Sequence, residues 1–295
     1  MAYASFSTLL KAAEEHGTIA AAAAALESEE TDVSVADIRV RMGEALQVMR
    51  AAIERGSMGD LRSKTGLTGG DAAKILDLEG TPARPIGGLF ARVIGASVAT
   101  AEVNAAMGRI VAAPTAGASG IVPAAIIVLG EEYGLSEDAL IDGLLTAGAI
   151  GGIFAASATL SGAVGGCQAE TGTGAAMAAA AAASMLGGSP DTVGQAASLA
   201  MQGLLGLACD PVAGLVEVPC VMRNATGASV ALAGAEMALA GVRFPIPLDD
   251  VVFAAARIGS SLPPSIRETA RGGLAVTPTG LELTARVRRE MDGRA

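Results

Sequence analysis

The sequence has few aromatic residues, few cysteines and little positive charge. Among its 295 residues there is no Trp, and there are only two Tyr, three Cys and one His. The net charge is −10, with no basic stripe along the chain. Because stacking aromatics and phosphate-binding basic residues are both scarce, we do not expect nucleic acid as a partner. The odd number of cysteines argues against a disulfide framework.

Small residues make up much of the chain instead. Apolar residues account for 51% of it and aromatic residues for 2%, and there are 39 glycines and long alanine runs. Such a core has little bulk per residue, so its elements must approach closely to exclude water. Because alanine has the highest helix propensity, we predict an all-α fold, a compact bundle of tightly packed Ala/Gly-rich helices with glycine-rich loops.

Two uncharged stretches, residues 111–130 and 144–166, are long enough to cross a membrane. Both are rich in small and hydroxyl residues that insert weakly, and Pro114 and Pro123 interrupt the first. We therefore expect buried helices and no membrane association. Because Glu14 and its neighbours interrupt the start of any signal peptide, we expect a cytoplasmic location.

Apolar periodicity predicts the helices. Residues 5–56 form an amphipathic segment with capping signals at Ser28 and Ser34, and a glycine-punctuated loop then leads into a helix near Asp71. Further helices are expected at residues 87–110, 118–133, 137–154, 174–187, 191–206, 224–240, 249–261 and 281–291. No linker marks a boundary, so we predict one domain over residues 1–295, with 1–56 as an N-terminal segment and 57–295 as the core.

Four loops between those helices combine Gly or Pro with hydroxyl or acidic side chains. They cover residues 113–120, 161–174, 209–220 and 272–280. Loops of this kind place functional groups on a rigid scaffold, and their glycines expose backbone N–H groups to an anion or a sulfide. We expect the functional residues in these loops.

The three cysteines, Cys167, Cys209 and Cys220, are 42 and 11 residues apart. This spacing matches no zinc-finger or ferredoxin pattern, and three buried free thiols would account for it. Each cysteine adjoins a turn-forming Gly or Pro, however, whereas packing cysteines more often lie inside apolar periodic stretches. Three thiolates on three turns could hold a 4Fe-4S cluster by three corners, which leaves one iron open as a Lewis acid.

Six segments of the chain together resemble one enzyme family. They are SKTGLTGGDAAK, NAAMGRIVAAPTAGASGIVPA, LLTAGAIGGIF, SGAVGGCQAETGTGAAMAAAA, LGLACDPVAGLVEVPCVMRNATGAS and RETARGGLAVTPTG. In this order they resemble the alpha subunit of the iron–sulfur-dependent L-serine dehydratases of the two-subunit type. The resemblance covers about residues 38–280. It implies that Cys167, Cys209 and Cys220 hold a 4Fe-4S cluster and that a separate beta subunit is needed.

The resemblance also implies the reaction, in which L-serine is converted to pyruvate and ammonia by α,β-elimination. The open iron would bind the serine hydroxyl while a base removes the Cα proton. Pyridoxal phosphate is not expected. It needs a Schiff-base lysine, and Lys11, Lys64 and Lys74 are the only lysines, none in a loop of the expected phosphate-binding kind.

Several residues compete for the role of the base. His16, the single histidine, is expected on a solvated helix surface. We name Lys64 and Glu170 as the catalytic candidates, although a structural hydrogen bond to a loop amide would equally explain Glu170. Asp210, Glu217 or a group of the beta subunit are the alternatives, and Asp210 also suits a turn.

Two loops combine hydroxyl groups with free backbone amides, an arrangement that suits a carboxylate. Ordinary capping and turn hydrogen bonds would explain the same residues. Arg223 could pair with the carboxylate or with an acidic neighbour, and resemblance alone suggests that Arg267 and residues 272–280 close the pocket. The substrate-binding candidates are Ser63, Thr65, Gly66, Thr68, Thr115, Gly117, Ser119, Arg223 and Asn224.

Three other functions fit parts of the sequence. A cysteine desulfidase, or another cluster-dependent lyase, would use similar elimination chemistry with a thiol in place of the hydroxyl. A redox sensor would respond to oxidant but not to substrate. A membrane protein rich in small residues would fractionate with membranes. An exposed iron would also make the protein sensitive to oxygen.

Overall fold

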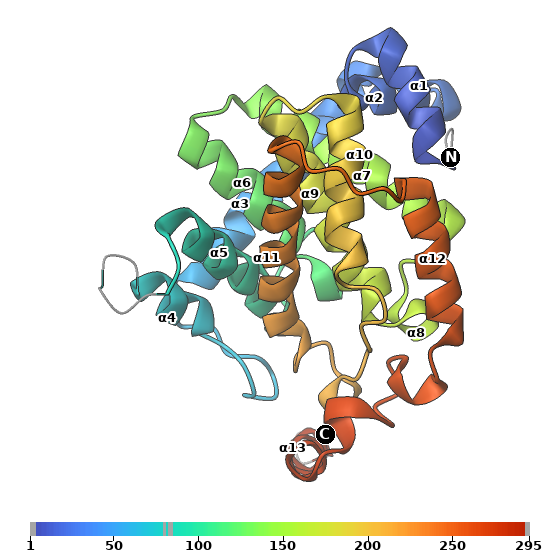
Figure 1. The fold of residues 1–295 in the computed structure, drawn as a ribbon. Coiled ribbons are helices and arrows are strands. Elements are labelled where there is room, and N and C mark those ends of the chain that lie inside the picture. Colours follow the sequence, from blue (N-terminus) through green and yellow to red (C-terminus); the bar gives the residue numbers. More distant parts are fainter. Residues whose placement is uncertain (1–3, 79–80, 82–84, 293–295) are drawn as a thin grey trace.

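The computed structural model describes residues 4–78, 81 and 85–292. Within these residues the chain forms thirteen α-helices and no strand, and Figure 1 shows how the helices are arranged. An isolated parallel bridge joins Cys209 to Arg267. The all-α prediction is confirmed.

The predicted N-terminal segment consists of three helices, α1 (Phe6–His16), α2 (Ile19–Thr31) and α3 (Val35–Ser57). Ser34 caps α3 as predicted, since its Oγ accepts the Asp37 N–H at 3.1 Å. The cap predicted at Ser28 is wrong, because that residue lies inside α2. Thr18 caps α2 instead, and Gly17 ends α1 with a φ of +85°. His16 is exposed in the last turn of α1.

Ten helices form the rest of the described chain. They are α4 (Asp71–Asp77), α5 (Gly88–Ala105), α6 (Ile121–Tyr133), α7 (Glu137–Ser157), α8 (Gly162–Gly165), α9 (Thr173–Met185), α10 (Pro190–Gln202), α11 (Cys220–Leu239), α12 (Leu248–Ser261) and α13 (Pro278–Asp292). The start at Asp71 agrees with the prediction. Helix α5 ends five residues early, where Met107 takes a φ of +64° and turns the chain.

Helix α9 lies in the middle of the molecule (Figure 1). It consists mainly of alanine, and its alanines from residue 178 to 183 are fully buried. Helices α6, α7, α10 and α11 pack around it. Because alanine side chains are short, these neighbours approach closely, as the composition predicts. The same closeness occurs between α3 and α5, where a Cβ at Gly56 would lie 2.1 Å from the Ala99 carbonyl oxygen.

Helix α7 is the one helix among the described residues that is long and apolar enough to cross a membrane. Its most apolar stretch is 67% buried inside the fold. It packs against α2, α3, α6 and α9, which is the environment of a core helix. The expectation of a buried helix is therefore met for most of residues 144–154, whereas residues 155–157 are exposed, and residues 121–130 are likewise buried in α6.

The N-terminus of α4 depends on a carboxylate from α5. Glu102, 1% exposed, accepts the backbone N–H groups of Asp71 at 2.7 Å and Ala72 at 3.4 Å. The residue before this helix is Gly70, which has no side chain to do so. We expect Glu102→Ala to lower the free energy of unfolding by about 1–3 kcal/mol, because it leaves buried donors unpaired. Urea denaturation of the two proteins measures this, and an unchanged midpoint would contradict it.

Glu102 also predicts a pH dependence of stability. Burial raises the pKa of its carboxyl above the usual value, against the opposing effect of the Asp71 and Ala72 N–H groups. The unfolded chain therefore releases this proton at lower pH than the folded protein does. The contribution of Glu102 is fully favourable below its unfolded pKa and is lost as pH rises through the folded one. Relative to Glu102→Gln, the wild type should lose stability as pH rises above the usual carboxyl pKa of about 4.5, and parallel curves for the two proteins would refute this.

Candidate active site

All three cysteines are buried and free, and each has a different local structure. Cys167 immediately precedes a π-helical turn (Gln168–Gly172) that continues into α9. Cys220 is the first residue of α11. Cys209 lies on an extended segment, where its N–H donates to the Ile266 carbonyl at 2.8 Å. The prediction of a loop over residues 161–174 is wrong, since α8 and the π-helical turn occupy most of this segment. The glycines and other small residues that suggested a loop can also form short helical turns.

The thiols lie close enough to affect one another. Burial raises the pKa of all three, and the Cys167 sulfur raises those of Cys209 and Cys220 further. The pKa of Cys220 reaches about 12. The described residues include no group of three His, Cys, Asp or Glu side chains placed to hold a single metal ion. A cluster binds each thiolate at a different iron, so it does not need the sulfurs to meet at one point.

The residues around the cysteines suit a sulfur-ligated group. Gly162 faces Cys209, and a Cβ there would lie 3.1 Å from its sulfur. The sulfur of Cys167 raises the pKa of the Arg223 guanidinium, so a positive charge lies close to this thiol. Three free thiols beside a guanidinium form a donor set that fits an anionic iron–sulfur cluster.

Glu170 lies at the junction of three of the predicted loops. Its Oε1 accepts the Thr115 hydroxyl at 2.8 Å, and its Oε2 lies 4.0 Å from the sulfur of Cys209. Gly117 and Gly162 allow the backbone to pass near this carboxylate, because Cβ atoms there would lie 3.4 Å and 2.6 Å from it. Burial, and to a lesser extent the charge of Glu268, raise the pKa of Glu170.

Asn224 joins α11 to the loop of residues 113–120. Its Oδ1 accepts the Gly120 N–H at 2.8 Å, and its Nδ2 donates to the carbonyls of Gly117 at 2.8 Å and Cys220 at 2.9 Å. The side chain is fully buried. Its polar atoms are thus used within the protein. Ser119 is also fully buried, and its hydroxyl has no hydrogen-bond partner among the described residues.

Glu217 holds the loop of residues 63–68. It is 4% exposed, and its carboxylate accepts the hydroxyls of Thr65 at 2.5 Å and Thr68 at 2.9 Å, and the Thr68 N–H at 2.9 Å. Ser63 lies beside them, its Oγ 3.2 Å from that of Thr65. Lys64 and Gly66 are exposed at the tip. The hydroxyls predicted to bind substrate thus contact a carboxylate in this structure.

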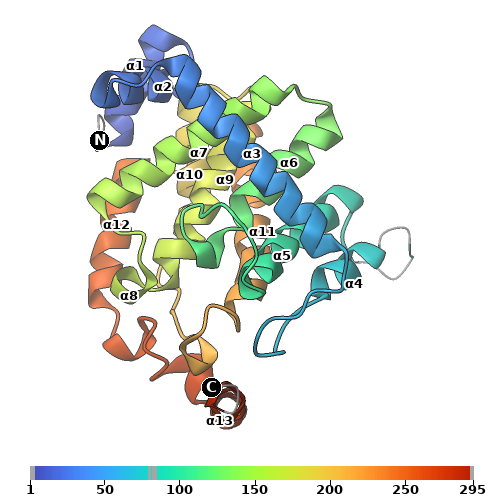
Figure 2. The same ribbon diagram turned by 180° about the vertical axis from the view of Figure 1, so that it is seen from behind.

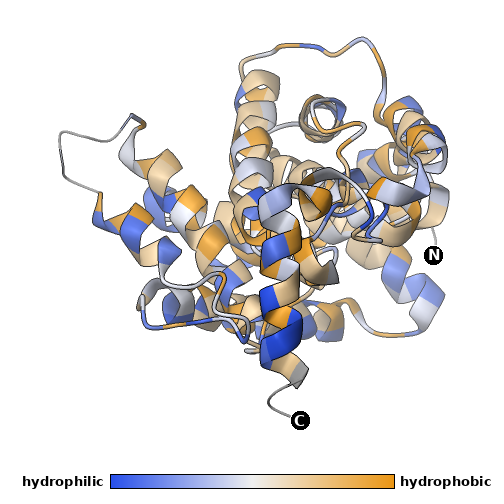
Figure 3. Ribbon diagram, turned by 90° about the horizontal axis from the view of Figure 1, so that it is seen from below, coloured by the Kyte–Doolittle hydropathy of each residue, from blue (hydrophilic) through white to orange (hydrophobic). Residues whose placement is uncertain are grey.

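A pocket of about 540 Å³ lies beside this loop. It brings together the predicted loops and the last helix, α13. Its lining residues are Lys64, Thr65, Asn104, Ala105, Met107, Ala116, Leu215, Val216, Glu217 and Met291. In Figure 3, α13 leads to the label C, with hydrophilic residues along its exposed faces. The pocket borders the Glu170 junction, since a Cβ at Gly117 would contact both Val216 and Glu170.

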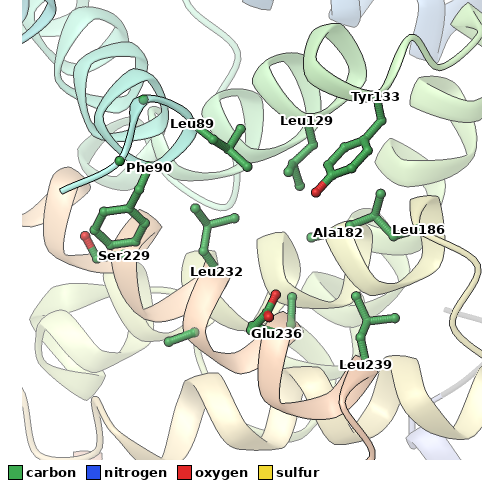
Figure 4. Close-up of a pocket in the computed structure, with 14 residues that line it drawn as sticks. Leu89, Phe90, Leu129, Tyr133, Ala182, Leu186, Ser229, Leu232, Glu236 and Leu239 are labelled. Atoms are coloured by element: carbon green, nitrogen blue, oxygen red, sulfur yellow. The ribbon is translucent and has the colours of Figure 1, made fainter. Parts of the chain in front are cut away.

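Another pocket, of about 460 Å³, lies between α5, α6, α9 and α11 (Figure 4). Leu89, Phe90, Leu232 and Leu239 give it apolar walls, and Glu236 points into it. None of the predicted site residues lines it. Its walls are mainly apolar, and the candidate site is therefore at the cysteines. Figure 2 shows the molecule from behind, with α13 at one end and α1 and α2 at the other.

Sequence reasoning missed Glu268. Its N–H donates to the Cys209 carbonyl at 2.8 Å, which fixes its backbone beside that cysteine. Its φ of +61° is rare for a residue with a side chain. The charge of Glu268 raises the pKa of Glu170, Cys209 and Cys220, so its carboxylate faces the site. The matching segment RETARGGLAVTPTG was the available signal, but Arg267 and residues 272–280 were selected from it, and Glu268 was not.

Because Glu217 holds the 63–68 loop, we expect Glu217→Ala to open that loop. Three hydrogen bonds to a buried carboxylate would be lost, and each such bond contributes about 1.5–3 kcal/mol. Trypsin should then cleave after Arg62 or Lys64 at least about tenfold faster, because cleavage follows the population of the open form. Limited proteolysis followed by mass spectrometry measures this. The exposed Glu282→Ala serves as control, and equal cleavage rates for the two variants would disprove it.

Comparison with known proteins gives one consistent answer. The family model described as serine dehydratase alpha chain matches residues 14–275. A Bacillus subtilis protein named probable L-serine dehydratase, alpha chain, is 48% identical over 89% of this chain and 87% of its own length. The L-serine dehydratase alpha chain of Peptoniphilus asaccharolyticus is 40% identical over 84% and 85%. A Streptomyces coelicolor L-serine dehydratase is 40% identical over 91% of this chain, which covers 59% of that protein.

The family model spans the first five segments on which the resemblance was based and the start of the sixth, and the long coverage excludes a match confined to one motif. The chain belongs to the serine dehydratase alpha chain family.

Proposed function

We propose that this chain is the alpha chain of a cytoplasmic L-serine dehydratase and that it converts L-serine to pyruvate and ammonia together with a beta chain. The family and the names of the relatives support the activity. The observation that carries the site is the carboxylate of Glu170, 4.0 Å from Cys209 and beside the other two thiols. We propose neither nucleic acid nor a membrane as a partner.

We propose that Cys167, Cys209 and Cys220 hold a 4Fe-4S cluster. When bound, the cluster supplies an open iron that polarises a substrate oxygen as a Lewis acid. Pyridoxal phosphate has no role in this proposal.

Glu170 is the base in this proposal. Its carboxylate takes the Cα proton of L-serine, and the β-hydroxyl departs with a proton as water, which leaves an enamine. Its imine tautomer then takes up water and gives pyruvate and ammonia. The hydrogen bond from Thr115 orients the carboxylate, and its raised pKa makes it a stronger base. Lys64, the other candidate, is exposed on the neighbouring pocket.

The hydroxyls of Thr65 and Thr68, which were predicted to bind the substrate carboxylate, already donate to Glu217. Other groups are therefore better candidates for binding this carboxylate. Ser119 is the buried substrate-binding candidate without a hydrogen-bond partner among the described residues. Gly66 and Gly117 lie in the two loops whose backbone amides were predicted to suit a carboxylate. We propose that these groups receive the carboxylate, while Thr65, Thr68 and Asn224 hold the loops in place.

The test is pyruvate release from L-serine by anaerobically reconstituted chain, with and without the beta chain. L-Cysteine and L-threonine serve as competing substrates. The proposal predicts preference for L-serine and dependence on the beta chain. Preference for L-cysteine would show a desulfidase, and a response to oxidant without turnover would show a redox sensor. Full turnover by the alpha chain alone would remove the partner from the proposal.

A further inference from the structure

One guanidinium contacts all three cysteine-bearing segments. Arg223 lies one turn after Cys220 on α11. Its Nη1 donates to the Ala208 carbonyl at 2.8 Å, next to Cys209. The sulfur of Cys167 lies near the guanidinium and raises its pKa. The three cysteine-bearing segments are distant along the chain, and Arg223 connects them.

An ion pair fixes this guanidinium. Its Nη2 lies 2.7 Å from Asp210 Oδ1, and the two side chains are only 16% and 6% exposed. Burial disfavours the charged guanidinium, but the sulfur of Cys167 and the carboxylate of Asp210 outweigh it and raise the pKa of Arg223. A permanent positive charge therefore lies among three buried sulfurs.

Asp210 extends the connection to the segment before α13. Its Oδ2 accepts the Leu274 N–H at 2.7 Å. The neighbouring Gly273 has a φ of +58°, and a Cβ there would lie 2.2 Å from the same oxygen. This position therefore requires glycine. Two nitrogens of the Arg223 guanidinium are thus already used within the protein, by the Ala208 carbonyl and by Asp210.

We propose that Arg223 is a positioning residue, which fixes the three cysteine-bearing segments relative to one another and offsets the negative charge of their thiolates. It does not bind the substrate carboxylate. Lysine cannot replace it, because a single ammonium lacks the fork of donors that contacts three groups at once. The inference rests on the proposed function for the identity of the cluster, but its main test needs no substrate.

The test measures how fast the reconstituted protein releases iron to a chelator under anaerobic conditions. Outer-shell residues typically change metal affinity by about 10–100-fold, so Arg223→Gln should release iron about 10–100-fold faster than the wild type. Arg223→Lys, which retains the charge, should fall between the two. Arg243→Gln is the matched control, because Arg243 forms an ion pair with Asp191 on the exposed surface. It should release iron at the wild-type rate.

Steady-state kinetics of the iron-loaded variants separate the two roles of Arg223. The positioning role predicts a KM for L-serine within about threefold of the wild type, since substrate binding is retained. Wild-type iron retention in Arg223→Gln with a KM raised more than about tenfold would assign Arg223 to the carboxylate and overturn the proposal.

The remaining outcomes are also decisive. If Arg223→Gln does not fold, the proposal is tested with Arg223→Lys and Asp210→Asn. Both variants should release iron faster than the wild type. Wild-type iron retention in these two would refute the proposal. A wild-type protein that holds iron but does not turn over L-serine would refute the proposed function. The positioning role of Arg223 would then be decided by the rates of iron release alone.

Discussion

Glu170→Gln is expected to lower kcat for L-serine by about 10²–10⁴-fold, which is the usual contribution of a positioned general base. Glutamine keeps an oxygen that can accept the hydrogen bond from Thr115, so the side chain should stay in place. It cannot take up the Cα proton. The iron content should be unchanged, because Glu170 is not among the proposed thiolate ligands. Anaerobic steady-state kinetics on the iron-loaded protein measure the effect.

Two further variants make this result specific. The exposed Glu282→Gln removes a carboxylate from α13 and should keep wild-type kcat. Thr115→Val removes only the orienting hydroxyl and should have a smaller effect than Glu170→Gln. A kcat for Glu170→Gln within about threefold of the wild type would move the role of base to Lys64 or to the beta chain.

Cys209→Ser is expected to reduce turnover to below about 1% of the wild type. Loss of an outer-shell partner alone typically costs about 10–100-fold, and loss of a ligand should cost more. The hydroxyl is a weaker ligand for iron than a thiolate, so iron and sulfide per chain should fall as well. Both are measured by chemical analysis after reconstitution, beside a pyruvate assay.

The control for this change is Ser198→Ala. It alters one buried side chain of α10, whose hydroxyl donates to the Gly194 carbonyl of the same helix. It should retain both iron and activity. If Cys209→Ser kept wild-type iron content and turnover, Cys209 would be one of the buried free thiols that its spacing also allows.

Local chemistry predicted the helices well. Alanine-rich runs without strand patterns led to α9, and Ser34 and Asp71 marked two helix starts. The incorrect prediction of a helix cap at Ser28 also has a local cause. Gly17 ends α1 and Thr18 directly after it caps α2, so α2 begins well before Ser28. The assignment of one domain, with residues 1–56 as an N-terminal segment and residues 57–295 as the core, stays a prediction.

The contacts of the site could not be predicted in the same way. Thr65 and Glu217 are 152 residues apart, and no local pattern indicates that a predicted substrate-binding hydroxyl contacts a carboxylate so distant in sequence. The same holds for Glu268 beside Cys209. The sequence already places Glu170 and Arg223 three residues after a cysteine, but only the fold shows that Glu170 lies near Cys209 and that Arg223 contacts Ala208 and Asp210.

The central claim is that Cys167, Cys209 and Cys220 together hold a cluster at which L-serine binds. The most direct measurement is the visible absorption of the anaerobically reconstituted protein before and after addition of L-serine, with L-alanine as the analogue without a hydroxyl. The account predicts a broad band near about 400 nm from thiolate-to-iron charge transfer, which changes with L-serine and not with L-alanine. A colourless protein that binds no iron, with all three thiols freely alkylated, would contradict it.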